Sequence, residues 1–217
     1  MEEEKIEFYK LLTDREKVLL KDNLIRKEFK KGEMIRDSTK SCIGVFVPLM
    51  GKLRVSIISD EGREITLYYV HPYDTCIFSA SCVLSNISFD VFIQAAEDTR
   101  GLLIPIQVFS QLQENNLRVK NLALEITNER FSDVMWALQQ LLFLPLQQRI
   151  VMFLYDEMIN NKSEELKLTH EDIARNIGSS REVITRSLKV FSKLGILEIG
   201  RGRIKILDKK ELISLMK

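Results

Sequence analysis

The sequence contains few of the residues that would indicate a secreted or disulfide-bonded protein. It has three cysteines, an odd number, which argues against a disulfide scaffold and fits a reducing cytosol. It has only nine glycines and four prolines, and no stretch is low in complexity or rich in Gly and Ser. No apolar run approaches the roughly 18 residues needed to span a bilayer. The N-terminus, Met1-Glu2-Glu3-Glu4-Lys5, lacks the apolar core of a secretory signal. These absences predict an intracellular, cytoplasmic protein.

The charged residues that are present are unevenly distributed. The 217 residues carry a net charge of +1, and 45% of them are hydrophobic, which excludes a disordered tail or a coiled-coil rod and allows one large domain or two small ones. Residues 146–217 contain 14 basic and 10 acidic side chains, whereas the preceding 145 residues contain 18 and 21. We therefore expect two domains with different partners, the partner of the second being an anion.

Residues from about 28 to 109 follow a pattern of short strands separated by turns. Turns are predicted at Gly32, at Gly51 and at Asp60-Glu61-Gly62. The predicted strands cover residues 44–47, 53–57, 64–70, 89–93 and 100–104. Many short strands at this spacing favour a sandwich or a β-roll. A short amphipathic helix is expected before them, around residues 5–24.

A long helix is expected from about Asn116 to Leu142. About 25 helical residues extend roughly 37 Å, which is longer than a small β domain can cover. The economical partner for the remaining apolar stripe is a second copy of the same helix in a two-fold dimer. The predicted dimer interface consists of Leu122, Ile126, Phe131, Val134 and Leu138. The alternative is a helix that packs wholly on its own β domain.

A hinge is predicted at residues 143–145. The residue before Pro145 is disfavoured in the α region, and a proline suits the first turn of a new helix. The helical pattern restarts over residues 146–159.

Residues 168–189 carry the strongest pattern in the sequence. Thr169 with Asp172 fits a capping box that starts a helix, and Gly178 lies where a helix would end in the left-handed conformation. Ser179 with Glu182 fits a second capping box for the next helix. A short helix, a glycine turn and a second helix with a polar N-terminal face are typical of a helix-turn-helix.

The second helix of this motif has an apolar inner face and a polar outer face. The inner face is predicted to bury Ile184, Leu188, Phe191 and Leu194. An α-helix fits the major groove of B-DNA, where Arg181 and Arg186 can each chelate a guanine and Glu182 can accept from a cytosine. The residues predicted to contact DNA are Thr169, Ser179, Ser180, Arg181, Glu182, Thr185, Arg186, Lys189, Arg201 and Arg203. The alternative is a helical pair whose outer face is merely solvated.

Residues 195–207 predict a hairpin, the wing of a winged helix. Two alternating segments flank a Gly-rich turn. Arg201, Arg203 and Lys205 would contact phosphates, which position a domain without reading sequence. For each of them, an ordinary solvated charge is the alternative.

The order of β-roll, long helix, proline-marked hinge and winged helix-turn-helix resembles the Crp/Fnr family of bacterial transcription regulators. The matching stretches are residues 60–68, 96–99 and 180–186, and the resemblance covers nearly the whole chain. It implies an α+β protein with an effector-sensing, cupin-like β-roll (a double-stranded β-helix) over residues 1–115. A dimerisation helix and hinge over 116–143 and a winged helix-turn-helix DNA-binding domain over 144–217 would follow.

The same resemblance implies a function and a set of partners. Arg181, Glu182 and Arg186 would read bases of TGTGA-like half-sites in a palindrome. The protein would be a homodimeric regulator that works with RNA polymerase, and not an enzyme.

The effector pocket departs from that of the family's cyclic-AMP binders. Those proteins place a glutamate on the ribose and an arginine on the cyclic phosphate, whereas both charged groups are missing from residues 76–82 and 86–90 here. Cyclic AMP is therefore disfavoured as the effector. The remaining pocket is small and apolar with hydroxyl groups, and it either takes a small, weakly polar or aromatic effector or packs empty. Its predicted residues are Phe78, Ser79, Ser81, Phe89 and Phe92.

The cysteines suggest alternatives to control by a small effector. Cys76 and Cys82 could form a redox switch, or they could be buried small hydrophobes. An iron–sulfur cluster is disfavoured because no cysteine precedes Cys42, and haem is disfavoured because Ile77 and Ser79 occupy the positions of the family's ligands. The three thiols match no zinc pattern, and no metal is expected.

Two rival functional classes follow from these residues. A thiol oxidoreductase would use Cys76 and Cys82, but the chain has no Cys-x-x-Cys, no phosphate-binding glycine loop and no nucleophile elbow. A ligand-binding module that no longer binds DNA is the third hypothesis.

Overall fold

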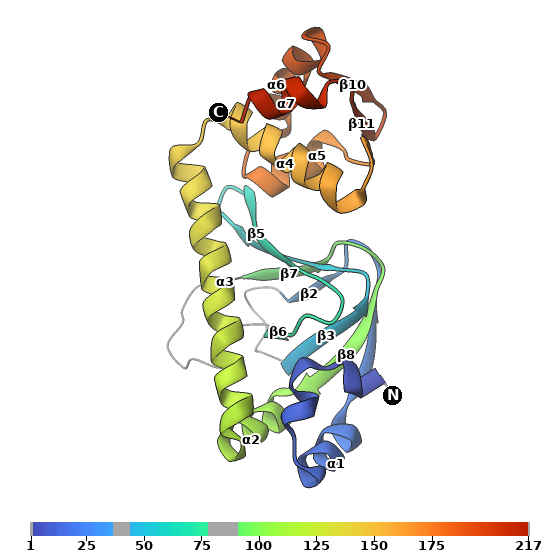
Figure 1. Ribbon diagram of the computed structural model, residues 1–217, viewed down its shortest axis with the longest axis vertical. Helices are drawn as coiled ribbons and strands as arrows, with labels where there is room; N and C mark the ends of the chain where they lie inside the picture. Colours follow the sequence, from blue (N-terminus) through green and yellow to red (C-terminus); the bar gives the residue numbers. More distant parts are fainter. Residues whose placement is uncertain (1, 37–43, 78–90, 217) are drawn as a thin grey trace. The chain divides into compact units, whose positions relative to one another are not determined.

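The structure is a computed structural model that describes residues 2–36, 44–77 and 91–216 (Figure 1). Its residues form two compact units. The first draws on Met1–Ile57 and Leu67–Met135, and the second on Ile58–Thr66 and Trp136–Lys217. No helix in the described ranges is long and apolar enough to cross a membrane.

The N-terminal segment of the first unit contains three short helices instead of the single helix predicted around residues 5–24. Two 3₁₀ helices, η1 (Glu2–Lys5) and η2 (Glu7–Leu11), precede the α-helix α1 (Asp14–Asn23). Thr13 is the N-cap of α1 and forms a capping box with Glu16. This cap fixes where α1 begins and separates α1 from the two 3₁₀ helices before it.

The β-roll consists of two four-stranded sheets, whose residues belong to the first unit except Ile58 and Glu64–Thr66. Their strand orders are β1-β8-β3-β6 and β2-β7-β4-β5. The turn predicted at Gly32 is present, with a φ of +86°. The strands are β1 (Ile25–Phe29), β2 (Met34–Arg36), β3 (Gly44–Met50), β4 (Leu53–Ile58), β5 (Glu64–Val70), β6 (Cys76–Ile77), β7 (Phe92–Ala95) and β8 (Thr99–Pro105). This arrangement confirms the predicted roll.

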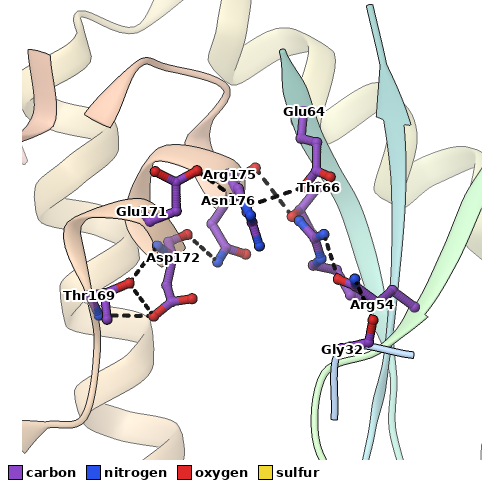
Figure 2. A network of polar contacts seen from close by, with 10 residues as sticks. Gly32, Arg54, Glu64, Thr66, Thr169, Glu171, Asp172, Arg175 and Asn176 are labelled. Carbon is purple, nitrogen blue, oxygen red and sulfur yellow. Dashed lines mark hydrogen bonds and ion pairs between the residues drawn. The ribbon is translucent and has the colours of Figure 1, made fainter. Parts of the chain in front are cut away.

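A polar bridge joins two strands of the second sheet to the turn before a third. The buried Arg54 on β4 donates through Nη2 to Oε1 of Gln94 on β7, at 2.9 Å. The Gln94 amide in turn donates to the carbonyl oxygen of Gly32 in the turn before β2, also at 2.9 Å. Arg54 and Gly32 are labelled in Figure 2. The bridge supplies hydrogen bonds to polar groups that would be costly to bury without them.

Two helices follow the roll, α2 (Ile106–Asn115) and α3 (Leu117–Phe143). The predicted helix over 116–142 is therefore confirmed to within one residue at each end. Val119, Ala123 and Ile126 of α3 are buried, and the first two belong to a core that also contains Phe8 and Phe109.

The second unit is a winged helix-turn-helix with its own hydrophobic core. Its sheet has the order β10-β11-β9. The core residues Ile150, Leu154 and Ile184 are 0% exposed. The elements are α4 (Leu146–Asn161), β9 (Glu165–Leu166), α5 (His170–Ile177), α6 (Arg181–Lys193), β10 (Leu197–Gly200), β11 (Arg203–Ile206) and α7 (Lys209–Ser214). Pro145 stands immediately before α4, as its restricted φ predicted.

Candidate nucleic-acid interface

The first helix of the motif, α5, begins with the predicted capping box. The Thr169 Oγ1 accepts from the backbone N–H of Asp172 at 3.1 Å, and the Asp172 carboxylate accepts from the Thr169 N–H at 2.9 Å (Figure 2). The Thr169 hydroxyl also donates to this carboxylate at 2.6 Å. Such a cap typically stabilises a helix by about 1 kcal/mol.

The turn between α5 and α6 is held by Gly178 and two arginines. Gly178 ends α5 in the left-handed conformation, with φ +66° and ψ +51°, as predicted. Arg149 Nη1 donates to the Ile177 carbonyl at 2.7 Å, and Arg63 Nε and Nη2 both donate to the Gly178 carbonyl. These two positive charges therefore satisfy carbonyl groups at the negative end of the α5 dipole.

The start of α6 differs from the prediction by one residue. Ser180, and not Ser179, is the N-cap, and its Oγ accepts from the backbone N–H of Val183 at 3.4 Å. The third residue of α6 is Val183, so Glu182 cannot complete the predicted capping box. The Glu182 side chain is exposed instead of being used in a cap.

The end of α6 also corrects the predicted inner face. Ile184 and Leu188 are 0% exposed and Phe191 is 4% exposed, as expected, but Leu194 is 64% exposed. The helix ends at Lys193, so Leu194 does not continue the buried stripe.

The outer face of α6 presents the residues predicted to read bases. Arg181, Glu182 and Arg186 are exposed, and neither arginine has an ion-pair partner within the described ranges. Ser179 and Thr185 are half-buried. The other members of the predicted set are exposed: Thr169, Ser180, Lys189, Arg201 and Arg203.

A contact between α5 and α6 was not anticipated from the sequence. The Thr185 hydroxyl donates to the Arg181 carbonyl at 2.8 Å and lies 2.8 Å from His170 Nδ1. Burial, and then the charges of Arg181 and Lys189, lower the pKa of His170 from its ordinary 6.5. The two residues are 15 apart in the chain, and only the helix-turn-helix geometry brings them together.

The wing carries its basic residues around a tight turn. The turn between β10 and β11 contains Gly202 with a φ of +70°. Arg203 pairs with Glu165 of β9 at 3.2 Å, and both side chains are more than half exposed. Such a pair contributes little stability, so Arg203 remains available to a phosphate at small cost. Arg201 lies beside Gly202 and is exposed.

Arg175, in the last turn of α5, links α5 to residues of β5. Its Nε lies 3.3 Å from Glu171 of the same helix and 3.6 Å from Glu64. The three residues are labelled in Figure 2. The Thr66 hydroxyl donates to the Arg175 carbonyl at 3.4 Å. Thr66 and Arg175 are 109 residues apart, so no local pattern could have indicated this contact.

The predicted effector and redox residues are largely beyond the described ranges. Phe78, Ser79, Ser81, Phe89 and Cys82 lie outside them. Phe92 is half-buried on β7, where it pairs with Ser56 of β4.

Cys76 is 3% exposed within the core of the roll. A thiol in this position is shielded from solution oxidants, and the redox alternative is not favoured.

Two residues of the predicted dimer interface face their own domain. Ile126 is 6% exposed, and Leu122 packs against the core of the roll. Ile126 is therefore covered by its own chain, whereas Leu122 is only half-buried. The apolar stripe of α3 has two sides, and periodicity does not indicate which side packs on the roll. Phe131 and Leu138 are 65% and 43% exposed, and Val134 is half-buried.

A β-roll, a long helix and a winged helix-turn-helix in this order define a transcription regulator with separate sensing and DNA-binding parts. Comparison with known proteins agrees. Residues 148–215 match the model of the Crp-like helix-turn-helix domain. A transcriptional regulator of the Crp/Fnr family from Eubacterium rectale is 40% identical, and its structure matches with a TM-score of 0.93 over 98% of this chain and 99% of that one.

Two curated relatives are more distant. The anaerobic regulatory protein of Aggregatibacter actinomycetemcomitans is 23% identical over 89% of this chain and 78% of its own length. The transcriptional regulator SdrP of Thermus thermophilus is 26% identical over 77% of this chain and 81% of its own. The chain belongs to the Crp/Fnr family of transcriptional regulators, which bind DNA and act as dimers.

Proposed function

We propose that this chain is a homodimeric regulator that reads a palindromic DNA site through α6. The observation that carries the proposal is the exposed trio of Arg181, Glu182 and Arg186 in the first turns of α6. Residues near the N-terminus of such a helix reach base edges in the major groove, and two copies of it would lie roughly 34 Å apart on half-sites one helical turn apart.

Each exposed side chain has a chemical role in this proposal. Arg181 and Arg186 each donate a bidentate pair to guanine O6 and N7, and Glu182 accepts from a cytosine amino group. Lys189 and Arg201 neutralise phosphates. The hydroxyl of Thr185 is engaged by His170 and the Arg181 carbonyl, which leaves its methyl group for a thymine methyl.

The dimer is supported by a second, exposed apolar face of α3. Six exposed apolar residues of α3 follow one another at intervals of seven or of four and three, which fits the a/d spacing of a two-stranded coiled coil: Leu117, Leu124, Phe131, Met135, Leu138 and Leu142. Trp136 and Phe143 are also exposed but fall outside this spacing. We call this face the α3 seam; it consists of Leu117, Asn121, Leu124, Asn128, Phe131, Met135, Leu138 and Leu142. The buried Val119 and Ile126 lie on the opposite side of the helix.

The polar residues around the α3 seam favour a parallel, in-register pair. Asn121 and Asn128 occupy two a positions, where asparagine specifies register and a two-stranded state. Lys120 and Glu125 occupy g and e positions, so that Lys120 faces Glu125 of the partner subunit in a parallel pair. A parallel pair also places two α6 helices by two-fold symmetry, as a palindrome requires.

The remaining parts of the proposal follow from this role. The regulator acts in the cytoplasm on chromosomal DNA, contacts RNA polymerase and catalyses no reaction. Cyclic AMP is disfavoured as its effector, because the sequence lacks the charged residues that bind the ribose and the cyclic phosphate in the family's cyclic-AMP binders.

The test is DNA binding by fluorescence anisotropy, with a palindrome of TGTGA-like half-sites and a scrambled control. Arg181→Ala should weaken specific binding by about 1–3 kcal/mol and relax the preference at one base pair of each half-site. Lys193→Ala is the matched control, because Lys193 is an exposed basic residue at the far end of the same helix. Equal affinities of Arg181→Ala and the parent for the palindrome would refute the assignment.

A further inference from the structure

The first unit contains a cavity on one side of α3. Among the candidate site residues in the described ranges, Ile126 alone lines this cavity. It has a volume of about 380 Å³, within the range of small-molecule sites. Three segments that are distant in the chain form its walls: the 3₁₀ helices at the N-terminus, the turn at residues 73–75 and the middle of α3.

The two basic residues of the cavity are already engaged. Arg130 pairs with Asp133 of α3 at 2.9 Å and with Asp74 of the turn at 3.7 Å. The Lys5 ammonium lies 3.3 Å from the hydroxyl of Tyr73 and 5.0 Å from the centre of its ring. Each of these two positive groups therefore already has a polar partner within the protein.

The groups of the cavity without a partner in the protein are two exposed carboxylates and one buried hydroxyl. Glu7 and Glu129 line the cavity, and neither carboxylate has a hydrogen-bond or ion-pair partner in the described part of the chain. Thr75 also lines the cavity and is 3% exposed, yet its Oγ1 has no hydrogen-bond partner among these residues. A buried hydroxyl without a partner is uncommon and costly, which indicates a missing ligand group.

The electrostatics of Glu7 agree with an excess of negative charge. Burial, and then the neighbouring carboxylates of Glu129, Asp74 and Glu125, raise the pKa of Glu7, although Arg130 opposes the effect. A cation placed among these groups would relieve their repulsion. Within the described ranges, no group of three or more His, Cys, Asp or Glu side chains is arranged to hold a metal ion, which favours an organic cation.

We propose that this cavity binds a small organic cation with a primary ammonium group, held by Glu7 and Glu129 with the Thr75 hydroxyl as a further acceptor. An ammonium group has three hydrogen-bond donors and no acceptor, so it can donate to the two carboxylates and to the hydroxyl oxygen of Thr75. Its site is formed by the face of α3 that carries Ile126 and Glu129, opposite the α3 seam. A second copy on the α3 seam would therefore leave the cavity open.

The site is placed to act as an effector site. A ligand there would join the N-terminal segment and the roll to α3, the helix that carries the α3 seam. It changes DNA affinity if it binds the DNA-competent state more tightly than the other state. This regulatory role rests on the function proposed above, whereas binding of the amine does not.

Isothermal titration calorimetry of the full chain with 1,4-diaminobutane tests the binding site without DNA. The matched control ligand is 1,4-butanediol, which has a similar length and no charge, at the same ionic strength. Saturable heat with the diamine and none with the diol is the expected result. Equal heats with both compounds, or no saturable heat with the diamine, would overturn the proposal.

Variants locate the binding. Glu7→Gln and Glu129→Gln should each weaken diamine binding about tenfold or more, since each removes one charge-assisted contact. Glu114→Gln is the control, because Glu114 is an exposed carboxylate of α2 that does not line the cavity. Losses of equal size in all three variants would contradict the proposed site.

Thr75→Val gives a readout that is independent of charge. It keeps the shape of the side chain and removes the hydroxyl without a partner, so thermal stability should hold or rise while diamine affinity falls. Unchanged affinity in this variant would remove Thr75 from the site.

DNA anisotropy with and without the diamine then separates the two proposals. A change in DNA affinity that disappears in Glu129→Gln supports the effector role, and an unchanged DNA affinity refutes it. A chain that binds the diamine but no specific DNA would refute the proposed function and leave the binding site standing.

Discussion

Removal of the Phe131 ring is a direct perturbation of the proposed dimer. Phe131 is 65% exposed in the single chain and lies at a d position in the middle of the α3 seam. Because its contacts within its own chain are few, Phe131→Ala should leave the monomer folded. Two-fold symmetry places two copies at the seam, so one substitution removes two rings from the interface.

The size of the effect follows from the exposed fraction. Full burial of a phenylalanine side chain contributes about 1.5–3 kcal/mol. With 65% of the side chain left to bury, each ring contributes about 1–2 kcal/mol, and the pair about 2–4 kcal/mol. The dimer Kd should therefore rise by about 30- to 700-fold.

Sedimentation velocity over a dilution series measures this Kd. Trp136→Ala is the matched control, because Trp136 is 55% exposed on the same helix but occupies a b position outside the α3 seam. It should change the Kd by a few-fold at most. A dimer that survives Phe131→Ala unchanged, or that is weakened as much by Trp136→Ala, would refute the seam.

Three further predictions concern the DNA-binding unit. Gly178→Ala and Gly202→Ala both force alanine into a positive φ, which costs about 1–2 kcal/mol. At Gly178 the new Cβ would also lie 2.7 Å from Ile65 Cγ1, whereas nothing lies within 4 Å of a Cβ at Gly202. Urea denaturation should therefore show the larger loss for Gly178→Ala, and equal losses would contradict the packing. Thr169→Ala removes the cap of α5 and should lower the free energy of unfolding by roughly 0.5–2 kcal/mol in the same assay; an unchanged midpoint would argue against the cap. Burial, and then two neighbouring basic side chains, lower the pKa of His170 below 6.5, so the folded state binds its proton less readily than the unfolded state does. Stability should fall as the pH decreases through about 6.5 toward the folded pKa, and His170→Gln should flatten this slope; the same slope in the variant would assign it to other groups.

Local patterns predicted the elements of the DNA-binding unit well. The capping box of Thr169 and Asp172 and the left-handed Gly178 depend on groups within three or four residues of each other, so the sequence contains all the information they need. The same holds for the strand over residues 64–70, whose bounds match β5. The wrong cap predicted for α6 was a local error as well. Two serines precede α6, and Ser180 is the N-cap because it directly precedes Arg181, the first residue of the helix.

The long helix shows where periodicity stops being informative. Its apolar residues predicted α3, but the pattern did not separate the residues that pack on the roll from those left exposed. Leu122 and Ile126 were assigned to the dimer and pack on their own domain, whereas Leu124 and Met135 are exposed. The exposed fraction of each side chain, which only the folded unit determines, separates the two faces.

The family, the order of the elements and the residues on the outer face of α6 could all be predicted from the sequence, because helix caps, glycine turns and apolar periods act over a few residues. The contacts of Arg63 with Gly178 and of Glu64 with Arg175 form only in the folded chain, because each joins residues more than 100 positions apart. Folding also brings Glu7, Thr75 and Glu129 to one cavity. No local sequence pattern predicts such long-range contacts, because they form only after the chain has closed its long loops and packed its core.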